Sequence, residues 1–251
     1  MVTPRRLIQS IFVLAMAGAP WVSSAQEPRA LTFDVASVKP STPDDRLMYR
    51  LQPGGRYIAT AQTLRVLVAN AWGIPPWRVA GAEGWRDSER YNIEAKTAAP
   101  LPPWPDSNKQ VSEMLQSLLK DRFQLAVHPE VRQETVYDLV IAKSGSRLKA
   151  AGDGESPAFG MEPGRIRFVA TPLELFAGNL ANVLGRKVSD KTGLTGKFDA
   201  TVVYAPDDSG PGDDRPSLFT AIEQQLGLRL DSTKGAVEFI VIDRAEKPGS
   251  N

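Results

Sequence analysis

An internal repeat constrains the fold of this sequence more than any other feature. Leu51–Asn70 and Met161–Asn179 share one order of residues: an apolar residue before a Pro-Gly turn, an Arg-led β-type run, and a helical pattern with leucine near its start. Self-similarity of this kind is the signature of a duplicated structural unit. We therefore predict two related modules.

Hydrophobic periodicity predicts the same elements in both copies. The first helical stripe contains Leu64, Leu67, Val68, Ala71 and Trp72, and the second contains Leu173, Phe176, Ala177, Leu180, Ala181 and Leu184. Both stripes have the three- and four-residue spacing of an amphipathic helix. The predicted fold class is α+β, with each copy roughly β-α-β-β-α-β-β and two helices packed on one face of a small mixed sheet.

Near the end of each copy, two short apolar runs predict two separate strands. In the first copy they are Phe123–Val127 and Val136–Ala142, joined by an exposed polar link at His128–Thr135. In the second copy they are Leu228–Leu230 and Val237–Ile242. With this assignment each half buries its own apolar residues.

The N-terminus predicts export to the periplasm or the extracellular space. A basic pair, a short apolar run and small residues near Ala25 are typical of a cleaved signal peptide. The predicted order is a signal peptide at 1–25, a first module at 31–146, a Gly- and Ser-rich linker at 147–162, a second module at 163–244 and a loose polar tail at 245–251.

The composition excludes several classes of partner and site. With 30 Lys and Arg against 29 Asp and Glu and no basic run, nothing indicates binding to nucleic acid. The apolar runs are shorter than the roughly 20 residues that span a bilayer, so no membrane span is expected in the mature chain. The absence of cysteine excludes disulfides, and the single His128 excludes sites that need two imidazoles.

Longer stretches carry two family resemblances. Residues 33–40, 119–125 and 188–199, with His128, resemble a large exported family known as domain of unknown function 3738. That family implies export over nearly the whole mature chain and brings no established activity. The pattern of residues 164–242 is also similar to the short N-terminal domain of secretins and TonB-dependent receptors, which implies a periplasmic docking module.

Motifs of acyl-enzyme chemistry are interpreted as structural. Ser117 and Lys120 have the S-x-x-K spacing, and Ser189-Asp190 and Lys191-Thr192-Gly193 resemble the two other motifs of penicillin-recognising enzymes. The mechanism requires the serine at a helix N-terminus, whereas Ser117 is predicted in mid-helix. We expect Asp190 to cap its loop and His128 to be a surface residue or a hydrogen-bonded structural one, and we predict no catalytic residue.

An acidic loop is the weak candidate for a metal site. It contains Asp207, Asp208, Asp213 and Asp214 around a Ser-Gly-Pro-Gly turn. Carboxylates suit Ca²⁺, but the spacing is not that of an EF-hand. Acidic Gly- and Pro-rich loops are usually solvated, so no metal and no other cofactor is predicted.

Aromatic residues give the better functional lead. All tryptophans of the expected mature chain lie in the first copy, beside proline-rich loops. We predict a partner-binding site formed by Trp72, Pro75, Pro76, Trp77, Trp85 and Trp104, because tryptophan beside such loops suits a protein, peptide or sugar contact. The alternative is that these tryptophans fill the first core.

The favoured function is non-catalytic recognition or docking in the periplasm or cell envelope, with a protein or peptide partner. Pairing through an open sheet edge is a reasonable mode of binding. Two other interpretations stay open. One is a hydrolase that uses serine or carboxylate chemistry, and the other is a small-ligand carrier with a pocket between the modules.

Overall fold

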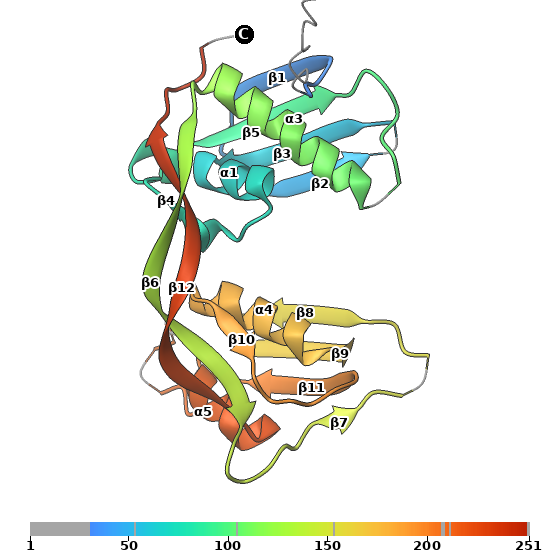
Figure 1. Cartoon of the computed structure of the whole chain (residues 1–251), viewed down its shortest axis with the longest axis vertical. Helices are drawn as coiled ribbons and strands as arrows, with labels where there is room; N and C mark the ends of the chain where they lie inside the picture. The colour runs from blue at the N-terminus through green and yellow to red at the C-terminus, as the bar shows by residue number, and fades with distance from the viewer. Residues whose placement is uncertain are drawn as a thin grey trace, which may run out of the picture. The chain divides into compact units, whose positions relative to one another are not determined.

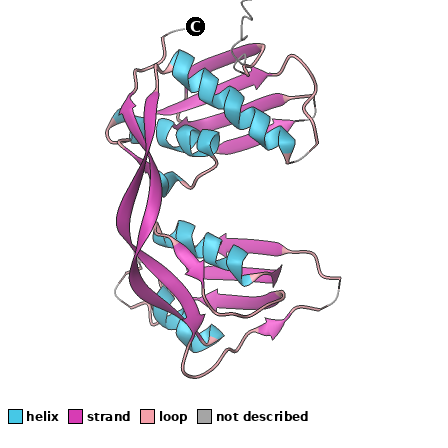
Figure 2. Cartoon of the chain, in the orientation of Figure 1, coloured by secondary structure: helices cyan, strands magenta, loops and turns pink. Residues whose placement is uncertain are grey.

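The structure is a computed structural model that describes residues 31–52, 54–103, 105–152, 154–206, 209–210 and 212–249. The predicted signal peptide lies outside the described residues, and so do Trp104, Asp207 and Asp208. Within the described ranges, helices accompany three four-stranded sheets (Figures 1 and 2), which confirms the α+β class. None of the helices in these ranges is long and apolar enough to cross a membrane.

The first sheet has the strand order β1-β5-β3-β2, and helices α1 and α3 lie over one of its faces (Figure 1). Its strands are β1 (Val35–Pro40), β2 (Met48–Gln52), β3 (Arg56–Thr63) and β5 (Arg90–Lys96), and the helices are α1 (Leu64–Trp72) and α3 (Asp106–Arg122). Strand alternation places Tyr57, Ala59 and Ile93 in the core, where all three are fully buried.

The second half repeats this sheet in the order β7-β11-β9-β8. Its strands are β7 (Lys149–Ala150), β8 (Ala158–Glu162), β9 (Arg165–Thr171) and β11 (Phe198–Val203), with α4 (Leu173–Leu184), α5 (Leu218–Ala221) and the π-helical η2 (Ile222–Leu226). Each strand has a counterpart at the same place in the first sheet. Two of them, β7 and β8, lie in the segment predicted as a linker at 147–162.

The predicted helical stripes are confirmed in both halves. The apolar residues from Leu64 to Ala71 and from Leu173 to Ala181 that were assigned to the stripes are buried, and Trp72 and Leu184 are half-buried. Each helix ends on a left-handed glycine, at φ 62° for Gly73 and φ 59° for Gly185. Glycine adopts this conformation without a Cβ clash, as the sequence indicated.

An unusual backbone conformation recurs at one position in the two halves. Ala61 and Ala170 have φ values of 55° and 45°. The N–H of Ala61 donates to Asn92 Oδ1 at 2.9 Å, and the N–H of Ala170 donates to Asp199 Oδ1 at 2.7 Å. A left-handed alanine costs about 1–2 kcal/mol. The same strained residue with the same side-chain acceptor therefore supports the duplication.

The central sheet, with the order β10-β6-β12-β4, differs from the prediction. β6 (Ala126–Ile141) and β12 (Leu228–Arg244) are continuous strands that pair antiparallel along their length (Figure 1). The predicted break at His128–Thr135 is wrong, because these residues belong to the ladder. The short strands β4 (Val79–Ala80) and β10 (Val188–Asp190) pair in parallel with β12 and β6, respectively.

The two long strands exchange their ends between the cores. Ile240 and Ile242, from the end of β12, are buried in the core of the first half. Leu139, from the end of β6, is buried in the core of the second half. The last strand segment of each copy thus completes the other copy, across the division predicted at 147–162. This is domain swapping within one chain.

Candidate binding site

The structure separates the predicted tryptophan site into different places. Trp72 and Trp85 are half-buried and pack against the first core. Trp77 packs against the second core. Trp104 lies outside the described residues. The structure therefore brings Pro75, Pro76 and Trp77 together and places Trp72 and Trp85 elsewhere.

Pro75, Pro76 and Trp77 line a cavity of about 890 Å³, which we call the Trp77 groove. The prolines lead into the short helix η1 (Pro76–Arg78). The helix α4 adds Gly178 and Ala181 to the lining, and β10 and β12 add further residues. Because α4, β10 and β12 all belong to the second copy, no pattern in the sequence linked them to Trp77.

Trp77 is fixed by aromatic contacts but lacks one hydrogen bond. Its ring meets Phe239 edge-on, with centroids 6.4 Å apart and planes at 81°. Arg132 lies over the same Phe239 ring, 5.0 Å from its centroid. The Trp77 Nε1 is buried, and no hydrogen-bond partner for it exists among the described residues. An unpaired buried donor costs about 1–3 kcal/mol, so tryptophan occupies this position at a cost to stability.

Charged groups of both signs line the groove. Arg78 donates through Nε to the carbonyl of Glu238 at 2.5 Å, and its guanidinium lies 3.6 Å from the Glu238 carboxylate. Lys187 is exposed, and its side chain forms no ion pair with a described residue. The groove thus offers a paired arginine and glutamate together with a lysine ammonium that is open to a ligand.

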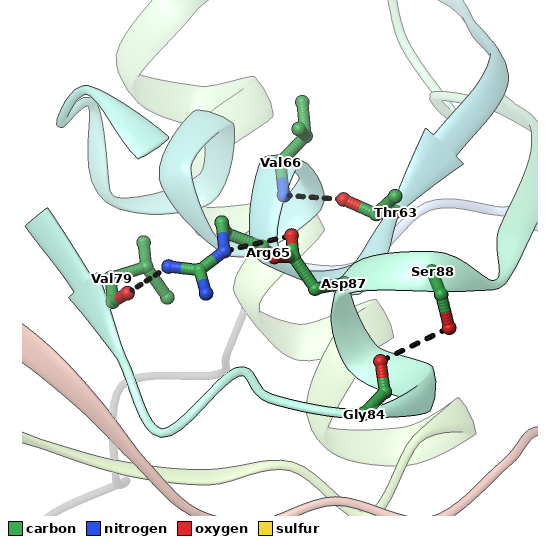
Figure 3. Close-up of polar contacts among 7 residues, drawn as sticks. All are labelled: Thr63, Arg65, Val66, Val79, Gly84, Asp87 and Ser88. Carbon is green, nitrogen blue, oxygen red and sulfur yellow. Dashed lines mark hydrogen bonds and ion pairs between the residues drawn. The ribbon is translucent and has the colours of Figure 1, made fainter. Parts of the chain in front are cut away.

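Arg65 holds elements that adjoin the segment carrying Trp77, and Figure 3 shows its contacts with Asp87 and Val79. Its Nε donates to Asp87 Oδ1 at 2.8 Å, and a terminal nitrogen donates to the carbonyl of Val79 at 2.6 Å. Asp87 lies in the short helix α2 (Trp85–Ser88), and Val79 begins β4 directly after η1. Arg65 therefore ties the first turn of α1 to β4 and α2, the two elements that follow the Trp77 segment.

The segment predicted as a loose tail makes contacts near Trp85, through the residues that the structure describes. The Trp85 ring meets Tyr91 edge-on at 6.4 Å, and the ammonium of Lys247 lies 6.0 Å from its centroid. Lys247 also pairs with Glu89. One residue earlier, the N–H of Glu246 donates to the carbonyl of Phe123 at 2.7 Å. Trp85 therefore takes part in contacts within the protein.

The residues considered for catalysis are engaged in structural hydrogen bonds. Ser117 Oγ donates to the carbonyl of Glu113 at 3.1 Å within α3. Asp190 Oδ1 accepts from the backbone N–H of Thr192 at 2.9 Å, which confirms the predicted loop cap. His128 Nδ1 lies 2.8 Å from Asp243 Oδ1, and both side chains are half-exposed. No sequence pattern pointed to Asp243, because its proximity to His128 depends on the β6–β12 pairing.

Asp213, one of the weak metal candidates, forms an ion pair. Arg215 Nε donates to Asp213 Oδ1 at 2.9 Å, and a terminal nitrogen of Arg215 donates to Oδ2 at 2.6 Å. The hydrogen bonds from Arg215 lower the pKa of Asp213 to about 2. Among the residues that the structure describes, no group of three or more His, Asp or Glu side chains could hold a metal ion.

This ion pair predicts a pH dependence. Because the pKa of Asp213 is lower in the folded state, its stabilisation is complete above the unfolded-state pKa of about 4 and is lost as pH falls towards 2. In an NMR titration we expect Asp213 to protonate near pH 2 in the wild type. In Arg215→Gln the midpoint should rise towards the usual value of about 3.9, because the side-chain hydrogen bonds are lost while the backbone N–H of residue 215 still donates to Asp213 Oδ1. The same midpoint in both proteins would contradict the pairing.

The fold and the groove define a class: an α+β protein of two repeated halves that exchange strand ends and share one apolar groove. Residues 65–245 match the family described as "Protein of unknown function (DUF3738)", and the chain belongs to this family. This confirms that part of the resemblance found in the sequence. Comparisons with curated proteins and with solved structures gave no match.

Proposed function

We propose that this protein is a non-catalytic recognition protein of the periplasm or cell envelope, and that it binds a peptide segment of a partner protein in the Trp77 groove. The observation that carries the proposal is the groove itself, a cavity of about 890 Å³ built on a half-buried tryptophan. Binding sites are concave and largely apolar, with a few polar groups that orient the ligand. Tryptophan is also prominent among the residues that dominate binding energy at interfaces.

The lining of the groove favours a peptide with an apolar side chain. Gly178 and Ala181 of α4 occupy little volume, which leaves space beside the Trp77 ring. Lys187 and Glu238 supply a donor and an acceptor for main-chain groups of the peptide. The similarity of residues 164–242 to a docking domain of secretins and TonB-dependent receptors agrees with a peptide or protein partner. The signal-peptide pattern at 1–25 supports the proposed location.

Gly178 allows the groove to be blocked without disturbing the core. A Cβ added at this residue would meet no atom within 4 Å, apart from the backbone of its own helix. Replacing a helical glycine by a residue with a side chain also favours the helix by roughly 0.5–1 kcal/mol. Gly178→Leu should therefore fold at least as well as the wild type and fill the space beside Trp77. Gly178→Ala is the matched control, because it has the same effect on the helix and adds only a methyl group.

The probe is a set of peptides selected on the wild-type protein from a random peptide library. We expect Gly178→Leu to weaken their binding at least about tenfold in calorimetric titration, which is about 1.4 kcal/mol. Gly178→Ala should bind nearly as the wild type does, and the melting temperatures of both variants should be equal to or above that of the wild type. Peptides that bind Gly178→Leu with unchanged affinity would show that the groove is not the binding site.

A further inference from the structure

The Trp77 groove meets β12 at an edge of that strand. Three consecutive residues of β12, Ala236, Val237 and Glu238, line the groove. Successive side chains of a strand point to opposite faces of the sheet, so a cavity over one face would be lined by every second residue. Because β6 pairs with one edge of β12 along its length, the groove lies at the other edge.

The contacts of Glu238 show which main-chain groups face outwards at this edge. In an antiparallel pair, every second residue directs its N–H and C=O away from the partner strand. The Glu238 carbonyl accepts a hydrogen bond from Arg78 Nε, outside the β6–β12 ladder, so Glu238 is one of the outward residues. The register does not shift in this part of the ladder. Ala236 and Lys234, two and four residues earlier, therefore also face outwards.

The partner strand gives the same assignment. The N–H of Tyr137 in β6 donates to the carbonyl of Lys187 at 2.9 Å, away from β12. Tyr137 lies opposite Ser232 in the register, and the two residues of such a pair both face outwards. Ser232 is thus an outward residue of β12, in phase with Lys234 and Ala236.

The outward groups of β12 are open next to the groove. Ser232, Lys234 and Ala236 are exposed, and among the described residues no strand pairs with them on the outer side. The strand β4 occupies this edge only at Ile240 and Val241. It shows that the edge accepts a parallel strand, and it ends before the groove. Main-chain donors and acceptors are therefore available where the groove meets the strand.

The other edge of the same ladder is protected, whereas this one is not. Pro129 occupies an outward position of β6, in phase with Tyr137, and proline has no N–H to offer to a further strand. No proline occurs in β12, and the Lys234 ammonium turns across the ladder to Thr135 Oγ1 at 3.1 Å. Natural sheets protect long open edges because such edges pair with other chains. The unprotected edge beside an apolar groove indicates a binding edge.

We propose that the peptide in the Trp77 groove is extended and adds to the sheet as a strand along the outer edge of β12. Its main chain forms hydrogen bonds with the outward groups of Ala236 and Lys234, and alternate side chains enter the groove beside Trp77. This inference rests on the proposed peptide recognition and specifies the ligand as an extended segment. In binding of this kind, main-chain hydrogen bonds provide affinity and pockets for alternate side chains provide specificity.

The first test is an N-methyl scan of peptides that are selected on the wild type and weakened by Gly178→Leu. Methylation replaces one main-chain N–H at a time, and only every second N–H of an added strand faces β12. We expect binding at least about tenfold weaker at alternate positions and little change at the positions between them. Loss without alternation would overturn strand addition and leave the groove as the binding site. Peptides insensitive to Gly178→Leu would overturn the proposed function itself.

The second test changes the edge of the protein. Ala236→Pro removes one outward N–H and no hydrogen bond to β6, and it should weaken binding at least about tenfold. Gln133→Pro is the matched control, because Gln133 is exposed opposite Ala236 and faces outwards on the other edge. It should bind as the wild type does.

Hydrogen exchange of the wild type followed by NMR gives a measurement that needs no variant. In the free protein, the amides of Ala236 and Lys234 should exchange fast, whereas that of Val237, which faces β6, should be protected. Saturation with a peptide weakened by Gly178→Leu should protect Ala236 and Lys234 as well. Equally fast exchange of both amides with and without that peptide would overturn the proposal.

Discussion

Replacing Ile240 with alanine is expected to destabilise the core of the N-terminal half, although Ile240 lies in the last strand of the chain. Ile240 is 7% exposed and belongs to the first core, together with α1 and α3 residues. Leu139, from the first copy, is 0% exposed in the second core. Truncating a buried Leu or Ile to Ala costs about 2–5 kcal/mol, because it loses apolar contact and leaves a cavity. We expect a loss of this size for Ile240→Ala and for Leu139→Ala.

The exchange of strand ends can be tested by hydrogen exchange, which shows in which elements the backbone amides of each variant lose protection. In hydrogen exchange followed by mass spectrometry, Ile240→Ala should speed exchange mainly in β3 and α3. Leu139→Ala should do so mainly in β9 and α4. Val131→Ala is the control, because Val131 is 67% exposed in the same long ladder. If Ile240→Ala instead loosened β9 and α4, each strand would belong to its own copy and the exchange would be wrong.

The elements predicted correctly from the sequence are those that depend on local pattern. The stripes that begin at Leu64 and Leu173 repeat at helical spacing, and burial of one helix face follows from that spacing alone. Gly73 and Gly185 end their helices because the left-handed conformation is a local property. Each of these assignments needs no knowledge of which distant segment packs against the helix.

The exchange of strand ends could not be predicted from the same patterns. Val136–Ile141 and Val237–Ile242 are both apolar segments of similar length, so either segment can complete either core. The polar residues at His128–Thr135 suit an exposed turn as well as an exposed ladder. The choice depends on whether the chain turns back or continues, which is decided by the whole fold.

The candidate site depends on this tertiary information in part. The Pro75-Pro76-Trp77 segment was found by its composition, but its partners on α4 were not, because the two segments lie far apart in the chain.

In each half, a turn joins the last helix to the long strand. Substitutions in these two turns are expected to change the free energy of unfolding by a large amount, with opposite signs in the two halves. Gly227 precedes β12 with φ 64°, and Gln124 occupies the equivalent place shortly before β6 with φ 47°. A Cβ at Gly227 would lie 1.9 Å from the carbonyl oxygen of Gly145, which is backbone and cannot rotate away. That neighbouring loop is held by the N–H of Arg147, which donates to the carbonyl of Leu226 at 2.8 Å.

Gly227→Ala combines a left-handed non-glycine residue with a backbone overlap, each of which costs about 1–3 kcal/mol. We therefore expect a loss of about 2–6 kcal/mol in denaturant unfolding. Gln124→Gly should instead gain up to about 1 kcal/mol, because relief of left-handed strain outweighs the added freedom of the unfolded chain. A Gly227→Ala protein within about 0.5 kcal/mol of the wild type, the range of ordinary surface substitutions, would show that the loop at Gly145 can move away. The close approach of these two turns would then not be a rigid part of the fold.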